Sequence, residues 1–422
     1  MEDNILVFVP HQDDEIDLIG NIIDRLKKYG NIIIVYSSLD KREKQGSIRK
    51  KEAIEACKVF NIDKQNIIFL GYPDTSNKEG KHFFTDGNKR IISDLENTII
   101  KYKPKYIFGT DFDSHSDHRM LSLAFDEAMG RVLRNTDNYF PIVMKGFCYE
   151  TAYYGIEDYN ATHIDICVPK YEILSNCSYE WNERYSIKGS EKNGFIWNNK
   201  VYKALRKHKS QYAILHAQSI INADNVFWQR RTDNLVFKAK VSTSSGNVDK
   251  LKDFMIIDTN DIITENPRFI DFSKGVWTPD KDDDSPKITI EFDIPKDISE
   301  IILHGNPNND RVEKINAKII INNKELFVEK IMPYGRNTKI KADVKDVNEI
   351  EITFDSDIYN YGLSEIEIFN RESNLNDLFV QNPEYVKQEK SYKDIINDLG
   401  YRFIVFKTKV KRKLKKIVGD RV

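Results

Sequence analysis

The residues best suited to chemistry stand near the start of the chain, in the stretch PHQDDE that follows the apolar run ILVFV. This stretch places His11, Asp13, Asp14 and Glu15 at the end of a predicted buried strand. Like charges repel one another there and their desolvation is costly, so another group must compensate them. A bound cation would do so. The alternative is a simple helix N-cap, because an aspartate at a helix start can satisfy free backbone N–H groups.

A second cluster supplies the partners that a cation needs. The stretch TDFDSHSDH follows the run YIFGT and carries Asp111, Asp113, His115, Asp117 and His118. Two imidazoles and one carboxylate with an open fourth position form a common catalytic zinc set, which His11, Asp14 and His118 can provide. The same donors also suit ferrous iron. Zinc lowers the pKa of bound water to about 7 and polarises a carbonyl. A carboxylate that is not a ligand must then take the proton, and Asp13 is the candidate general base.

Both clusters fit an α/β fold with a doubly wound sheet. From residue 5 to about 150, apolar runs alternate with helix-like stretches, which is typical of βαβ units. The runs are apolar throughout, as expected of parallel strands covered by helices on both faces. Residues 11–14, 72–74 and 110–118 each follow such a run, and ligands bind outside the carboxyl ends of parallel strands. The sequence therefore predicts a Rossmann-like, mostly parallel sheet with one functional edge.

The pattern changes twice further along the chain. Residues 1–232 are assigned to the first domain. Short alternating strands separated by Asn, Asp, Gly and Pro turns then predict an antiparallel β-sandwich over 233–372. The third part, 373–422, contains RFIVFKTKVKRKLKKIV, where apolar residues recur every three or four positions among lysines and arginines. This pattern predicts a basic amphipathic helix, which can lie on an anionic membrane surface or pack on its own protein.

Composition excludes several classes of protein. The 422 residues carry a formal net charge of -2, so no overall polyelectrolyte character favours nucleic acid as a partner. The first strand ends in acids where a phosphate-binding glycine-rich loop would stand, which argues against a nucleotide enzyme. No signal segment and no run of roughly 20 apolar residues is found, and the four cysteines form no CxxC spacing. We expect a cytoplasmic protein, whose basic tail would allow peripheral contact with the inner face of the membrane.

PHQDDE followed about a hundred residues later by HSDH resembles the PIG-L/LmbE family of zinc-dependent N-acetylglucosaminyl deacetylases, whose usual motifs are (P/A)HPDDE and HxDH. The resemblance implies that His11, Asp14 and His118 are the metal ligands and that Asp13 is the general base. Gln12 replaces the usual proline, which removes a rigid φ angle but no ligand.

The same resemblance implies further roles. His115 would stabilise the oxyanion and could protonate the leaving group, and Asp117 would orient an imidazole. Arg49 falls where the family has its RxxE helix, and Asp74 ends LGYPD as a candidate for binding sugar hydroxyls. KALRKHKSQ resembles the helix that closes the family's domain. Both sugar-binding assignments have simpler alternatives, a surface ion pair of Arg49 with Glu52 and a turn aspartate at position 74.

The second domain resembles discoidin-like, galactose-binding-like sandwiches of the coagulation-factor type C class. Its loop around Trp277 and the aspartates of 280–284 could hold a sugar by stacking and hydrogen bonds. A structural or docking role is the alternative.

These features predict a metal-dependent hydrolase that removes the N-acetyl group from an N-acetylhexosamine (GlcNAc-like) glycoconjugate in cell-surface glycan biosynthesis. Zn2+ is the expected cofactor, with Fe2+ as the alternative. The expected partner is an amino-sugar glycoconjugate, and a basic tail would suit a lipid-linked one. Two rivals are a carbohydrate-binding protein with an inactive first domain and an amidase acting on a different amide. The complete set of metal and base residues argues against the first rival.

Overall fold

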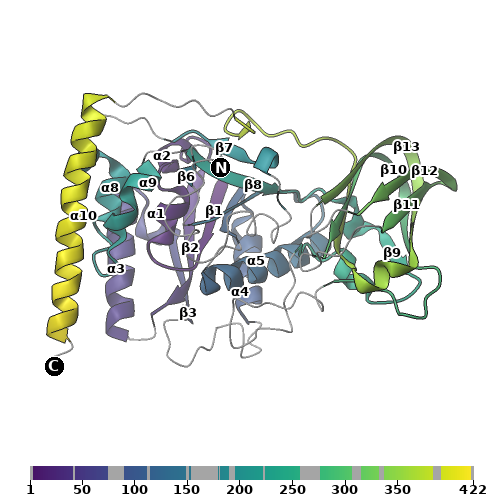
Figure 1. The fold of residues 1–422 in the computed structure, drawn as a ribbon, viewed down its shortest axis with the longest axis horizontal. Coiled ribbons are helices and arrows are strands. Elements are labelled where there is room, and N and C mark those ends of the chain that lie inside the picture. Colours follow the sequence, from purple (N-terminus) through teal and green to yellow (C-terminus); the bar gives the residue numbers. More distant parts are fainter. Residues whose placement is uncertain are drawn as a thin grey trace.

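The computed structural model describes residues 3–40, 43–74, 90–111, 115–148, 152–153, 179, 181–189, 195–221, 224–256, 276–306, 315–331, 337–383 and 391–419. Two folded parts lie side by side along the long axis of the molecule, and a long C-terminal helix runs beside the first part on the side away from the second (Figure 1). Asp113, predicted as part of the second acidic cluster, lies outside the described residues.

The first domain is built on a nine-stranded sheet, counted over the described residues. Neighbouring strands of its parallel half, in the order β3-β2-β1-β4-β5, are β3 (Ile67–Pro73), β2 (Asn31–Leu39), β1 (Asn4–Val9), β4 (Tyr106–Thr110) and β5 (Ile142–Gly146). Antiparallel strands extend the sheet beyond β5: β8 (Asp224–Arg230), β7 (Tyr185–Ile187), β6 (Ala152–Tyr153) and β15 (Val380–Gln381). The predicted mostly parallel α/β sheet is confirmed.

The chain winds outward from β1 through β2 to β3, and then crosses back to place β4 on the other side of β1. The connections that leave β1 and β4 therefore run in opposite directions. Such a switch point opens a crevice at the carboxyl ends of the two strands, where doubly wound sheets bind their ligands. Both predicted metal-binding stretches begin at this point.

Helices cover both faces of the sheet because alternate residues of each buried strand point to opposite sides. Leu6 and Phe8 of β1 join the core with the helices α4 and α5, while Ile5, Val7 and Val9 join the core on the other face. The helices are α1 (Asp14–Ile19), α2 (Ile23–Leu26), α3 (Glu43–Val59), α4 (Arg90–Tyr102), α5 (Ser116–Asn135), α8 (Lys200–Leu205) and α9 (Ala217–Ile221). The helix-like stretch that follows the first apolar run is thus split into two helices, α1 and α2.

The second domain is an antiparallel sheet that curls on itself to enclose a core (Figure 1). Its strands are β9 (Lys240–Thr243), β10 (Lys287–Gly305), β11 (Asn316–Ile321), β12 (Lys324–Lys330), β13 (Asn337–Phe354) and β14 (Leu363–Phe369). β10 is one long strand in place of the short strands expected here, and its pairing with β13 shifts register between Glu291 and Glu300. Such irregularities bend a strand and let it continue into a second layer.

Trp277 does not offer a surface for sugar stacking. Its side chain is fully buried, and its indole N–H donates to the carbonyl oxygen of Ser245 at 2.9 Å. Nearby Asp283 accepts hydrogen bonds from the hydroxyls of Ser244 and Ser245, both at 2.5 Å. The loop predicted to stack a sugar on Trp277 is therefore built around a core tryptophan, and that prediction is wrong.

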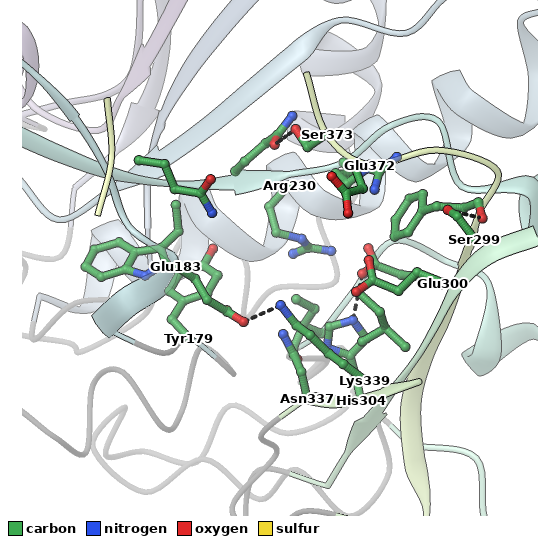
Figure 2. A pocket seen from close by; sticks show the side chains of 18 of the residues that line it. Tyr179, Glu183, Arg230, Ser299, Glu300, His304, Asn337, Lys339, Glu372 and Ser373 are labelled. Carbon is green, nitrogen blue, oxygen red and sulfur yellow. Dashed lines mark hydrogen bonds and ion pairs between the residues drawn. The ribbon is translucent and has the colours of Figure 1, made fainter. Parts of the chain in front are cut away.

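A polar cleft of about 400 Å³ separates the two domains. One wall comes from β7 and β8, and the other from the outer face of β10, β13 and β14 (Figure 2). Lys339 forms an ion pair across it with Glu183, and His304 bonds Glu367 at 2.8 Å within the second-domain wall. Charged and hydrogen-bonded groups thus line this cleft, while Phe237 and Phe254 of the second part pack into the first-domain core.

The chain returns to the first domain after the second. Strand β15 pairs with β7, and Leu378 and Phe379 are buried in the first-domain core. The last helix, α10 (Tyr392–Gly419), follows. Residues 373–422, expected as a separate tail, thus include a strand of the first sheet. In the part of the chain that the structure describes, no helix is both long and apolar enough to cross a membrane.

A buried charge cluster joins β5, α5 and β8. Lys145 is fully buried and its ammonium donates to Asp126 at 2.7 Å, while Arg230 reaches the other oxygen of Asp126 at 3.5 Å. Burial raises the pKa of Asp126 even though both cations lower it. Removing one member of such a cluster leaves a buried charge uncompensated, which is strongly destabilising.

Replacing Asp126 by alanine leaves two buried cations without their shared carboxylate. We expect Asp126→Ala to lower the free energy of unfolding by about 3–5 kcal/mol, measured by urea denaturation. The matched control is Asp24→Ala, which removes an exposed pair with Lys200 that also spans 2.7 Å. That change should cost at most about 1 kcal/mol. Equal losses in the two variants would contradict this reading of the cluster.

Candidate metal centre

The loop after β1 places His11, Asp13 and Asp14 at the switch point. Asp13 is the N-cap residue of α1, yet its side chain makes no cap hydrogen bond. Asp14 instead accepts from the backbone N–H of His11 at 2.8 Å, which folds the loop back on itself. The N-cap alternative therefore does not explain why these carboxylates stand here.

Ring nitrogens of His11 and His118 lie close to the carboxylate of Asp14. Its Oδ2 lies 3.0 Å from His11 Nδ1 and 3.3 Å from His118 Nε2. Tetrahedral zinc with ligand bonds of about 2.0–2.1 Å separates its ligand atoms by about 3.3 Å. Both distances from Asp14 are thus close to this spacing, and His11, Asp14 and His118 stay the predicted ligand set. All three are almost completely buried, so their charges have little access to water.

Asp117 supports this arrangement from behind. Its Oδ2 lies 2.8 Å from His11 Nε2, the ring nitrogen that does not face Asp14. Burial lowers the pKa of His11, but the Asp14 and Asp117 carboxylates outweigh it and raise that pKa to about 9. A ring held between two carboxylates is the usual arrangement of a metal-ligating histidine, because the outer carboxylate fixes its orientation and basicity.

The pKa of Asp14 depends on the same opposition between burial and neighbouring charge. Burial disfavours its charged form, but His118 and His11 hold its pKa well below the usual range. A cation between these rings would replace their protons while keeping the carboxylate ionised, since metal binding requires deprotonated ligands.

His115 also points into the centre. Ring nitrogens of His11, His115 and His118 lie within 4.8 Å of one another, so this triad is a second candidate ligand set. His115 Nδ1 accepts the backbone N–H of Asp117 at 3.1 Å. Burial and the neighbouring rings of His118 and His11 lower the pKa of His115 to about 3, so the ring is neutral at pH 7. Its single proton therefore sits on Nε2, which makes His115 a hydrogen-bond donor.

Asp13 is only half-buried by the protein, and its ionisation is unfavourable. Burial, followed by the Asp14 and Asp17 carboxylates, raises the pKa of Asp13 to about 6, although His208 and Arg49 oppose this. A carboxylate with a pKa near neutrality suits a general base better than one with an ordinary value. The general-base role of Asp13 stays a prediction.

His208 was left out of the predicted site, and this omission is a miss. The ring is fully buried, and its Nε2 lies 2.8 Å from Glu15 Oε1 in the same acidic stretch. Burial lowers the pKa of His208, but Glu15 outweighs it and raises the value. Glu15 of the acidic stretch is thus paired with His208. The available signal was KALRKHKSQ, which contains it.

Arg49 and Asp74 meet at the rim. Arg49 Nη1 lies 3.4 Å from Asp74 Oδ2, and Nη2 donates to Gln211. The alternative partner Glu52 instead bonds the backbone N–H of Ser210 at 3.0 Å. The surface ion pair with Glu52 is therefore wrong, while the sugar-binding role of Arg49 and Asp74 stays a prediction. Gln211, which the sequence did not single out, also donates to the backbone oxygen of Gln12.

Asp111 belongs to the protein interior and not to the metal centre. Its carboxylate accepts from Ser122 at 2.9 Å and from Tyr179 at 2.7 Å, and it lies 3.6 Å from Lys145 Nζ. Of the cluster predicted after β4, the structure thus brings His115, Asp117 and His118 to the centre.

Comparison with known proteins agrees with this geometry. Residues 6–129 match the PIG-L family, described as GlcNAc-PI de-N-acetylase. The first part of the chain therefore carries a PIG-L/LmbE deacetylase domain, and the predicted family is confirmed over these residues. No sequence among curated proteins matches the chain.

Solved structures resemble both parts of the chain. N,N'-diacetylchitobiose deacetylase from Pyrococcus horikoshii shares 17% identity over 54% of this chain and 83% of its own, with a TM-score of 0.36. GalB, the 4-carboxy-2-hydroxymuconate hydratase from Pseudomonas putida, shares 12% identity over 53% of this chain and 95% of its own, with a TM-score of 0.33. A Streptococcus pneumoniae fucose-binding module shares 16% identity over 33% of this chain and 95% of its own, with a TM-score of 0.23.

Removing a predicted metal ligand should weaken zinc binding more than removing the carboxylate of Asp117, which contacts the ligand His11. We expect His118→Ala to abolish stoichiometric zinc binding, measured by elemental analysis after dialysis against zinc. Asp117→Asn should keep the metal with about 10–100-fold lower affinity, measured by competition with a chelator. His304→Ala is the control, because it removes an equally buried histidine in the second domain. Full zinc content in His118→Ala would rule out the proposed ligand set.

Proposed function

We propose that this protein is a zinc-dependent N-deacetylase that hydrolyses the N-acetyl amide of an N-acetylhexosamine glycoconjugate. One observation carries the proposal: His11, Asp14 and His118 converge at zinc-ligand spacing while Asp13, beside them, remains outside the ligand set. The matched family, described as GlcNAc-PI de-N-acetylase, supports an N-acetylated amino sugar as the substrate.

Zinc in this site would polarise the amide carbonyl and lower the pKa of a water molecule. Asp13 accepts the proton of that water as its oxygen attacks the carbonyl carbon. His115 donates its Nε2 proton in a hydrogen bond to the carbonyl oxygen, where negative charge develops. The bond between carbon and nitrogen then breaks to give acetate and a free amine.

The departing nitrogen needs a proton because an amide anion is a poor leaving group. Asp13 holds the proton taken from water and can deliver it. His115 Nδ1 accepts the backbone N–H of Asp117, so the role proposed for this ring is hydrogen-bond donation from Nε2. Of the two proton donors that the sequence left open, the geometry and charge favour Asp13.

Arg49, Asp74 and Gln211 form the polar rim where the sugar would bind. Arg49 is held by both partners, so its guanidinium is fixed and only 17% of its side chain is exposed. We propose that hydroxyl groups of the sugar compete for the hydrogen bonds of this network.

The proposed setting is cell-surface glycan assembly, with zinc or ferrous iron as the metal.

Two rival functions remain distinct from this proposal. A carbohydrate-binding protein with an inactive first domain would need no general base, yet Asp13 stands next to the ligands with a raised pKa. An amidase acting on a different amide would use the same centre. Measuring acetate release from both N-acetylhexosamine conjugates and simple amides would distinguish it from the proposed deacetylase.

The decisive variant is Asp13→Asn, which keeps the side-chain size but cannot accept the proton. We expect it to retain zinc and to lower kcat for acetate release about 100- to 10,000-fold. Acetate is measured across a panel of N-acetylhexosamine conjugates and simple amides. Asp24→Asn, an exposed aspartate elsewhere in the domain, is the control and should act as wild type. Full activity of Asp13→Asn, or acetate release from none of the conjugates, would contradict the proposal.

A further inference from the structure

The C-terminal helix α10 presents two opposite faces with different surroundings. One face docks on the first domain through Tyr401, which is buried and donates from its hydroxyl to the backbone oxygens of Ile214 at 3.1 Å and Leu215 at 2.5 Å. Ile404 and Val405 pack on the same core, and Asn397 accepts the backbone N–H of Ile196 at 3.0 Å. The helix is therefore held firmly and in a defined rotation.

The opposite face is apolar and open to solvent. Nine large apolar side chains of α10 are between 41% and 69% exposed: Tyr392, Ile395, Ile396, Leu399, Phe403, Phe406, Val410, Leu414 and Ile417. At about 100° per residue, all nine fall within an arc of about 100° that is centred opposite Tyr401. We call these residues the apolar stripe. Large apolar surface left exposed in this way marks an interaction site.

Basic residues border the stripe on both sides. From Leu399 to Gly419 the sequence contains no Asp or Glu, and its eight Lys and Arg residues are exposed: Arg402, Lys407, Lys409, Lys411, Arg412, Lys413, Lys415 and Lys416. The helix is 28 residues long, so the stripe extends over about 40 Å. Figure 1 shows α10 on the outer side of the first domain, away from the second domain.

We infer that the apolar stripe of α10 docks the protein on the surface of an anionic lipid bilayer. A helix of this kind lies in the plane of the interface, buries its apolar face about 5–10 Å deep and pairs its cations with lipid headgroups. The contacts of Tyr401 agree with this orientation. They hold the first domain on one side of α10 and leave the apolar stripe exposed on the opposite side.

Charge favours lipid over a second copy of the chain. Two stripes packed together would bring two sets of eight cations close to each other, and this part of the helix offers no carboxylate to compensate them. An anionic bilayer supplies that compensation, at about 1 kcal/mol for each basic residue near the surface. The occupant is therefore an anionic membrane surface.

The test uses the full chain in sedimentation with vesicles of phosphatidylcholine alone or mixed with phosphatidylglycerol. The wild type should pellet with the anionic vesicles and not with phosphatidylcholine alone. Binding should weaken from about 0.1 M to about 1 M salt, because the Debye length falls from about 10 Å to about 3 Å. Absence of binding to anionic vesicles would overturn the inference.

Point variants keep the docked helix and test each component separately. Phe403→Ser combined with Phe406→Ser should weaken vesicle binding at least about tenfold. Changing Lys411, Lys413 and Lys415 to Gln should weaken it about 100-fold. Phe140→Ser is the control, because Phe140 is 58% exposed but lies outside α10. An unchanged melting temperature verifies that the variants remain folded.

Two results would overturn the inference in favour of another occupant. If the double phenylalanine variant binds anionic vesicles as well as wild type does, the stripe is not the docking surface. If wild type forms a dimer in analytical ultracentrifugation that the same variant dissolves, while neither binds vesicles, the stripe joins two copies of the chain.

Discussion

The structure depends on how negative charge is compensated at the carboxyl ends of β1 and β4. Asp14 and Asp117 are buried there with the rings of His11 and His118 between and beside them. Buried carboxylates are stable only when a positively charged group contacts them. Protonated histidines or one divalent cation can supply it, and the ligand-like spacing favours the cation.

Elsewhere in the chain, buried acids have partners of their own. Glu15 bonds His208, Glu367 bonds His304, and Asp126 is shared by Lys145 and Arg230. In the part of the chain that the structure describes, the side chains found close enough together to hold a metal are those of His11, His115 and His118. Asp13 has another setting: its side chain does not cap α1, it lies outside the proposed ligand set, and burial with the Asp14 and Asp17 carboxylates raises its pKa to about 6. Such a poised acid next to a metal site indicates catalysis.

Much of this could be predicted from the sequence, because the parallel strands are continuous apolar runs and both clusters follow them directly. Contacts between segments that lie far apart in the sequence could not be predicted. His208 reaches Glu15 across 193 positions, and Gln211 reaches Arg49 across 162. The burial of Trp277 depends on how the second sheet curls, which alternation of residues does not reveal. Periodicity identified the apolar side of α10, but the docking of Tyr401 on the opposite side required the three-dimensional structure.

The most direct test of the central claim is a crystal structure of the zinc-loaded protein with anomalous diffraction at the zinc edge. The account predicts one strong peak within about 2.0–2.2 Å of His11 Nδ1, Asp14 and His118 Nε2, with Asp117 still bonded to His11 Nε2 and Asp13 outside the ligand set. A peak held by His115 in place of Asp14, or rings of His11 and His118 too far apart to share one ion, would contradict it.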